Sequence, residues 1–269
     1  MNHTPLVLVG LFIYTNLLFA QPVQTAGDVF KLGVVAYQQS NYDESYKYLG
    51  QAINMDPNKY YFYYNRGMTL VAMGRSQEAM ADFKKSVTLK SSAEAFYQLG
   101  LIAYQQGNLP EAKNEFENAQ QLKPDMASAN FYLGLIYFRD KNYAEAYTYF
   151  ANCAAYNYAN AEVNYYKGYC EAEQGLHDKA MKSLLFATAA NSKDWKYYFK
   201  MYEAYNLLSE NQLALNNISM VIELGRRKPE YYMDRATLYT ATGQQALAEE
   251  DMGVANTLKA PVLTEDDHK

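Results

Sequence analysis

The 269-residue sequence predicts an all-α fold, a solenoid of seven helix-turn-helix repeats. The first observation is a column of glycines spaced by 33 or 34 positions: Gly33, Gly67, Gly100, Gly134 and Gly168. The second is that further small and large apolar columns run in the same register, and the third is a turn signal in the middle of every copy. Self-similarity at this period is typical of repeat architectures.

Two columns define the second half of each copy. The small column contains Ser45, Ala79, Ala112, Ala146, Ala180, Ala214 and Ala248. The large apolar column, four residues later, contains Leu49, Phe83, Phe116, Phe150, Leu184, Ile218 and Met252. Another small column follows three residues on, and spacings of four and three place all of them on one helix face. Small residues let two helix backbones approach closely, and the large side chain fills the space beside them.

Turn signals divide every copy into two antiparallel helices. From the first copy to the seventh they read QSNYDES, MGRSQEA, QGNLPEA, DKNYAEA, QGLHDKA, LSENQLA and TGQQALA. Pro110 lies in the first turn of the second helix of the third copy, where its missing N–H costs least. Pro57 and Pro124 end the first and third copies, because proline stops a preceding helix.

This pattern resembles the tetratricopeptide repeat family over residues 26–262. The seven copies span residues 26–59, 60–92, 93–126, 127–160, 161–194, 195–228 and 229–262. The resemblance implies a right-handed α-solenoid whose first helices line a concave groove. It also implies that groove positions lie three residues before the glycine column, one after it and four after it.

These positions are apolar or aromatic in the first five copies. They are Phe30, Val34, Tyr37, Tyr64, Met68, Val71, Tyr97, Leu101, Tyr104, Phe131, Leu135, Phe138, Tyr165 and Tyr169. The last two copies are more polar there, with Phe199, Glu203 and Asn206, then Met233, Thr237 and Thr240.

The residue directly after the glycine column is the most informative of these positions, because in this family it usually varies and is often polar. Five apolar residues there predict a continuous apolar surface that binds an extended or helical segment of a partner protein. Tyr64, Tyr97 and Tyr165 are equally consistent with rings that pack only on the neighbouring copy. The N-terminal segment or self-association are other ways to cover the surface. The Lys and Asn pattern of a carboxylate clamp is missing, so we expect no C-terminal acid as ligand.

An apolar run at residues 6–19, LVLVGLFIYTNLLF, predicts a secretory signal cleaved after Ala20. The run is shorter than the ~20 residues of a membrane-spanning helix. The domain order is then a signal peptide at 1–20, a short segment at 21–25, the repeats at 26–262 and a flexible tail at 263–269. We expect a periplasmic or otherwise extracytoplasmic protein that spans no membrane after cleavage. An uncleaved membrane anchor is the alternative.

Composition and motifs argue against nucleic-acid binding, metal binding and catalysis. The net charge of −5, the absence of a basic stripe and a pI of about 5.3 make nucleic acid an unexpected partner. The three histidines form no cluster with metal-ligand spacing, and no glycine-rich phosphate loop occurs. We therefore expect no catalytic, cofactor-binding or metal residues, no cofactor and no enzyme activity. Cys153 and Cys170 lie on helices expected to be neighbours, and they form either a disulfide or two separately buried thiols.

The function predicted from the sequence is a non-catalytic scaffold or adaptor of the cell envelope that binds a protein partner. One alternative is an exported repeat module that captures a glycan or another small or polymeric ligand. A second alternative is the regulatory subunit of an enzyme.

Overall fold

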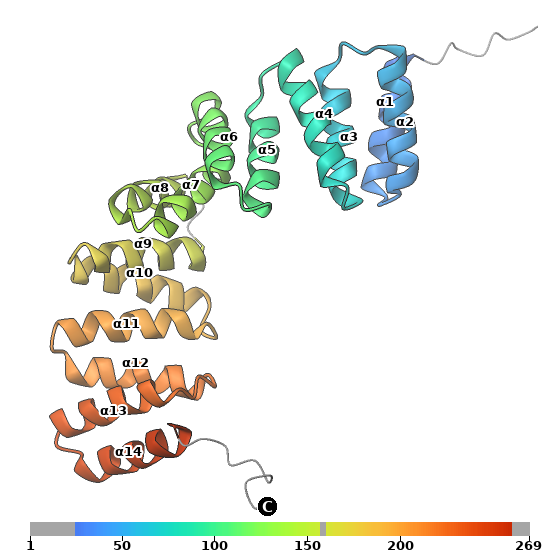
Figure 1. Cartoon of the computed structure of the whole chain (residues 1–269). Helices are drawn as coiled ribbons and strands as arrows, with labels where there is room; N and C mark the ends of the chain where they lie inside the picture. The colour runs from blue at the N-terminus through green and yellow to red at the C-terminus, as the bar shows by residue number, and fades with distance from the viewer. Residues whose placement is uncertain (1–24, 157–159, 260–269) are drawn as a thin grey trace, which may run out of the picture. The chain divides into compact units, whose positions relative to one another are not determined.

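A computed structural model describes residues 25–156 and 160–259, which form fourteen α-helices and no strand (Figure 1). The helices are α1 (Ala26–Gln38), α2 (Tyr42–Met55), α3 (Tyr60–Ala72), α4 (Ser76–Leu89), α5 (Ala93–Gln105), α6 (Leu109–Leu122), α7 (Ala127–Arg139), α8 (Tyr143–Ala155), α9 (Ala161–Glu173), α10 (His177–Ala190), α11 (Trp195–Leu207), α12 (Asn211–Glu223), α13 (Pro229–Ala241) and α14 (Gln245–Lys259). The all-α class is confirmed, and fourteen helices agree with seven helix-turn-helix repeats. The odd-numbered helices begin at the residues that open the seven predicted copies.

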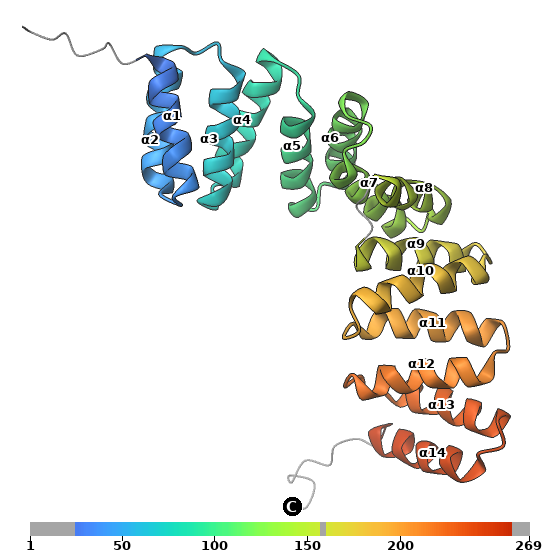
Figure 2. The ribbon, with the colours of Figure 1, turned by 180° about the vertical axis from the view of Figure 1, so that it is seen from behind.

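The chain divides into two compact units, residues 1–82 and 83–269, and the boundary falls within α4. The first unit contains α1, α2, α3 and the start of α4. The second contains the rest of α4 and the helices from α5 to α14. Within the second unit, Figures 1 and 2 show the helices from α9 to α14 lying side by side in chain order from opposite viewpoints.

Polar side chains start several of the first helices. The Thr25 hydroxyl accepts a hydrogen bond from the Asp28 amide at 3.2 Å, while the Asp28 carboxylate accepts one from the Thr25 amide at 3.1 Å. Ser92 and Asn160 likewise accept bonds from the amides of Ala95 and Val163. These caps satisfy amides that have no partner within the helix.

Each helix pair is joined by a residue in the left-handed backbone region. The seven turn residues with positive φ are Ser40, Gly74, Gly107, Lys141, Gly175, Ser209 and Gly243. In every pair the amide one residue later bonds back to a carbonyl of the first helix, as Asn108 does to Ala103 at 2.9 Å. This closing pattern ends the first helix and reverses the chain, so that the second helix packs against it.

The glycine column allows the helices of a pair to approach closely. A Cβ atom on Gly100 would lie 2.6 Å from the Phe116 ring, and one on Gly134 would lie 2.7 Å from the Phe150 ring. In six of the seven pairs the large apolar residue is completely buried, whereas Met252 in α14 is 43% exposed. The predicted packing of a glycine against a large side chain is therefore observed, and the core runs between the helices of each pair.

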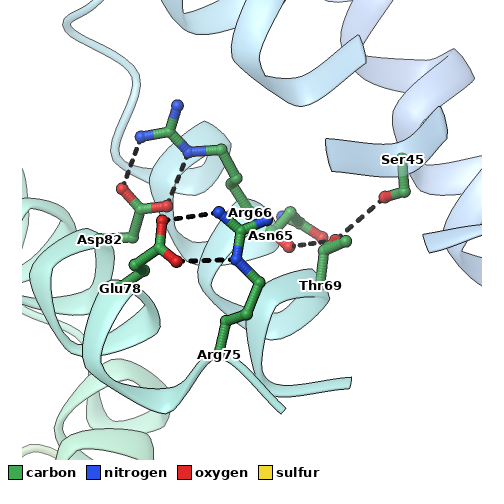
Figure 3. A network of polar contacts seen from close by, with 7 residues as sticks. All are labelled: Ser45, Asn65, Arg66, Thr69, Arg75, Glu78 and Asp82. Carbon is green, nitrogen blue, oxygen red and sulfur yellow. Dashed lines mark hydrogen bonds and ion pairs between the residues drawn. The ribbon is translucent and has the colours of Figure 1, made fainter. Parts of the chain in front are cut away.

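The first unit also contains a polar network, which Figure 3 shows at close range. Arg66 on α3 donates two hydrogen bonds to the carboxylate of Asp82 on α4, both at 2.7 Å. The hydroxyls of Ser45 and Thr69, both fully buried, are hydrogen-bonded at 3.0 Å. These contacts join α2 to α3 and α3 to α4 by directional bonds in addition to apolar packing.

Candidate functional site

In the first unit, α1 and α3 carry six of the residues predicted to bind a partner. Phe30, Val34, Tyr37, Tyr64 and Met68 are half-buried, and Val71 is exposed. The Phe30 ring stacks on Phe62 and meets Tyr61 edge-on, both at 5.0 Å between ring centres. Phe30 therefore packs α1 against α3 and presents only part of its ring to solvent.

In the second unit, the predicted residues lie on α5, α7 and α9. Their rings contact the first helix of the following pair: Tyr104 with Tyr132 at 5.2 Å, Phe138 with Tyr169 at 4.8 Å, and Tyr165 with Tyr197 at 5.0 Å. Aromatic pairs at these distances are attractive. The tyrosines and phenylalanines predicted as groove residues thus stabilise neighbouring repeats as well as forming surface.

Phe131 differs from the rest of the set. It is 9% exposed and packs with Phe150 and Val163 in the core, so it offers almost no surface to a partner. Tyr97, Leu101, Tyr104, Leu135, Phe138, Tyr165 and Tyr169 are all half-buried. We call the positions directly after the glycine column the apolar row: Val34 and Met68 in the first unit, and Leu101, Leu135 and Tyr169 in the second. Every member of the apolar row keeps part of its side chain accessible.

A pocket of about 520 Å³ lies among α9, α11 and α13 of the second unit, where the sequence analysis assigned no site. We call it the acidic pocket, and it is lined by Ala172, Glu173, Phe199, Lys200, Tyr202, Glu203, Ala204, Asn206, Leu207 and Asp234. The polar residues Glu203 and Asn206, at positions that are mostly apolar in earlier copies, were the signal that the sequence contained. Sequence reasoning missed Lys200 and Asp234, because they lie outside the three positions per copy that it considered.

Lys200 is the buried cation of this pocket and is 5% exposed. Its Nζ lies 2.6 Å from Glu173, 3.0 Å from Glu203 and 3.5 Å from the centre of the Tyr169 ring. Burial by itself lowers the pKa of Lys200, but the bonds to Glu173 and Glu203 more than offset this, so the pKa is raised. Lys200 is therefore charged and is committed to its two carboxylate partners.

Asp234 and Tyr202 form a second polar pair at the same pocket. Burial raises the pKa of Asp234, a hydrogen bond from Tyr202 opposes the rise, and the negative charges of Glu230 and Glu203 add to it. Burial also raises the pKa of Tyr202, and Asp234 adds to that shift. Tyr202 is consequently a neutral donor, and Asp234 is a half-buried carboxylate among other carboxylates.

The two cysteines are free and fully buried, so the disulfide that the sequence left open is not formed. Cys153 donates a hydrogen bond to the carbonyl of Ala127 at 3.3 Å. Burial raises the pKa of both thiols to about 12. Each thiol packs as a small apolar side chain, as the neighbouring alanines and serines of the Cys153 column do.

Other features expected from the sequence concern metals and membranes. In residues 25–156 and 160–259, no group of three or more His, Cys, Asp or Glu side chains is placed to hold a metal ion. None of the helices from α1 to α14 is long and apolar enough to cross a bilayer. The predicted signal peptide, residues 1–20, and the predicted tail, residues 263–269, lie outside the described residues.

Comparison with known proteins gives the same repeat. Family models described as tetratricopeptide repeat match residues 29–59, 48–81, 97–152 and 142–194. DnaJ homolog subfamily C member 7 of Mus musculus is 35% identical over 98 residues, which are 36% of this chain and 20% of that protein. The chain thus spans about a fifth of the length of that relative.

Two solved structures show the fold. A tetratricopeptide repeat protein of Parabacteroides merdae has a TM-score of 0.58 and 17% identity, covering 89% of this chain and 95% of that one. YrrB, described as a TPR protein with an unusual peptide-binding site, has a TM-score of 0.61 and 18% identity, covering 66% of this chain and 92% of that one. The family models, which together match more than half of the chain, show that the chain belongs to the tetratricopeptide repeat family.

Proposed function

We propose that this protein is a non-catalytic scaffold of the cell envelope that binds an apolar segment of a partner protein along its first helices. The observation that carries the proposal is the apolar row. Leu101, Leu135 and Tyr169 pack on neighbouring side chains, yet every member of the row is half-buried and keeps accessible surface at a position where the sixth and seventh copies have polar residues. Accessible apolar side chains on successive first helices, such as Leu101 on α5 and Leu135 on α7, suit the anchors of an extended or helical peptide.

Two further observations support a binding role. The chain belongs to a repeat family whose solved member YrrB is described as having a peptide-binding site. Cys153 and Cys170 are buried free thiols, and the Lys200 ammonium is held by two carboxylates, so none of these three groups is available as an exposed nucleophile. The envelope location rests on the apolar run at residues 6–19, which has the length of a signal peptide core.

The test is capture of a partner from an envelope extract by the purified chain and by a variant of the apolar row. Met68, Leu101 and Leu135 are replaced together by Glu, and in a milder version by Gln. We expect both variants to keep their helical circular dichroism and to lose the stoichiometric partner, because burying a charged or a polar side chain against the partner's apolar anchors costs free energy. The control replaces Leu185 and Phe186 of α10 by Glu, since both are strongly exposed and lie on a second helix.

Three outcomes decide between functions. Loss of capture in the row variants but not in the control supports the scaffold. Capture that survives in a folded Glu variant contradicts the apolar row as the binding surface. Retention of a glycan with no protein partner would favour the ligand-binding alternative. Separately, the mass of the N-terminal peptide of the secreted chain tests whether the chain is cleaved after Ala20.

A further inference from the structure

The acidic pocket has the size and the walls of a binding site. Its volume of about 520 Å³ lies within the range of ~300–1,000 Å³ that is usual for small-ligand pockets. Phe199, Ala204 and Leu207 form its apolar part, while Glu173, Glu203 and Asp234 supply its carboxylates. All of these residues belong to the second unit.

The charges lining this pocket do not balance. It has three carboxylates and a single ammonium group, that of Lys200. The Lys200 side chain is 6% exposed and is held between Glu173 and Glu203, so its charge is used by those two residues. Each carboxylate has two oxygens that accept several hydrogen bonds, which leaves unused acceptor capacity on both.

The ion pairs of Lys200 are with Glu173 and Glu203, so Asp234 is the pocket carboxylate that is not paired with Lys200. The groups that shift its pKa are the Tyr202 hydroxyl and two anions, Glu230 and Glu203, in addition to burial. Burial and repulsion between like charges both disfavour the ionised form. A cation placed beside Asp234 would offset both, whereas an anion would add to the repulsion.

The apolar wall suits a cation carried on an aliphatic stem. Phe199 is half-buried and offers a ring to such a stem and to the positive group at its end. The pocket also adjoins the apolar row, because Tyr169 of that row lies 3.5 Å from the Lys200 ammonium. A segment bound along the row would therefore bring a neighbouring side chain to this pocket.

We propose that the acidic pocket receives a lysine or arginine side chain of the partner segment, with its cation between Asp234 and Glu203 and its stem against Phe199. This inference rests on the proposed function, because it adds a basic residue to the apolar segment that the first helices bind. The proposed site lies in the last three repeats, and the polar residues that line it are not members of the apolar row.

The test uses three blocked peptides as probes against the isotope-labelled full chain in NMR titrations. They are acetyl-Gly-Arg-Gly-amide, acetyl-Gly-Lys-Gly-amide and acetyl-Gly-citrulline-Gly-amide, and citrulline has the shape of arginine without its charge. We expect the two cationic peptides to shift amide signals of pocket residues and to lower the pKa of Asp234. The citrulline peptide should bind at least about threefold more weakly than the arginine peptide.

Two matched variants complete the design. Asp234→Asn keeps the side-chain shape and removes one charge, so the cationic peptides should bind about threefold more weakly. Glu210→Gln removes a charge from an exposed residue before α12, which makes no side-chain capping bond and lies outside the pocket, and binding should not change. The pKa of Asp234 is measured with and without the cationic peptides. If Asp234 had only a structural role, adding a peptide would leave this pKa unchanged.

Several results overturn the proposal: equal binding of the citrulline peptide, no effect of Asp234→Asn, shifts outside the pocket, or no shifts at all. None of these touches the apolar row. If the apolar row variants lose partner capture while the arginine peptide fails to bind, this inference alone is wrong. If the peptide binds as expected while the row variants still capture the partner, the proposed function is wrong.

Discussion

Arg66 and Asp82, sixteen residues apart, form a two-point ion pair with both nitrogen–oxygen distances at 2.7 Å (Figure 3). Arg235 and Asp251 in α13 and α14 have the same spacing and the same two distances. Each arginine directly precedes the glycine column position, and each aspartate directly precedes the large apolar position. The same register therefore produces the same side-chain bond in the second and the seventh helix pair.

This repetition predicts the cost of breaking the pair. Asp82 is 5% exposed, so Asp82→Asn leaves the Arg66 guanidinium half-buried without its charged partner. We expect a loss of about 2 kcal/mol in the stability of the α3–α4 pair, measured by hydrogen exchange of its amides. Asp251→Asn should show a similar loss in α13 and α14. A double change of Arg66 to Met and Asp82 to Leu should cost much less, and equal costs would contradict this account.

The glycine column predicts opposite effects for the same substitution at two glycines. Gly134→Ala places a Cβ 2.7 Å from the Phe150 ring, so the pair must separate, and we expect a loss of about 1–3 kcal/mol. Gly253→Ala in α14 meets no atom within 4 Å and should gain up to about 1 kcal/mol from helix propensity. Urea unfolding followed by circular dichroism measures both. Equal signs would show that close approach does not explain the column.

The turn residues predict a stabilising substitution. Lys141 has φ of 57°, which costs a residue with a Cβ about 1 kcal/mol, and Gly107 occupies the equivalent turn at φ of 77°. Lys141→Gly should therefore raise the unfolding free energy by about 1 kcal/mol. Gly107→Ala is the reverse control and should lower it by a similar amount. Calorimetry of the three proteins checks both signs, and a destabilised Lys141→Gly variant would refute the argument.

The buried thiols predict low reactivity in the folded chain. With both pKa values at about 12, almost no thiolate is present at pH 8, and the sulfur atoms are also shielded from solvent. A chromogenic thiol reagent should label neither cysteine in the native protein and both in urea. A mass two units lower under non-reducing conditions, from protein exported to an oxidising compartment, would instead reveal a disulfide.

The same thiols predict a pH dependence of stability. Burial raises the pKa of Cys153 and Cys170 from the ordinary 9.0 to about 12, so the unfolded chain loses these protons first. Their contribution is fully present below pH ~9 and is lost as the pH rises toward ~12. Comparison with a variant carrying Cys153→Ala and Cys170→Ala isolates the effect, because the tyrosines titrate in both. The stability difference should narrow with rising pH, and a constant difference would contradict it.

Local chemistry explains why so much of the fold was readable. Gly107 and the residues around it set a turn, Pro110 starts the next helix, and Ala112 with Phe116 define its buried face. Each of these effects acts within a few residues, and the same pattern of residues recurs in all seven copies. The candidate site was only partly readable, because exposure depends on the neighbouring copy. Tyr104 and Phe131 carry similar rings at predicted groove positions, yet the first is half-buried and the second is buried.

By itself, the sequence determined that the chain is a series of seven helix pairs, since helix period, turn residues and small columns are short-range properties. Only the tertiary structure decided that Lys200 lies between Glu173 and Glu203, that Asp234 has no such cation, and that the two thiols stay apart. These relations join residues of α9, α11 and α13, or of α8 and α9. Apart from the contact of Lys200 with Glu203, which lie three residues apart on α11, no local pattern specifies them, because the packing of neighbouring repeats sets which side chains meet and how much water reaches them.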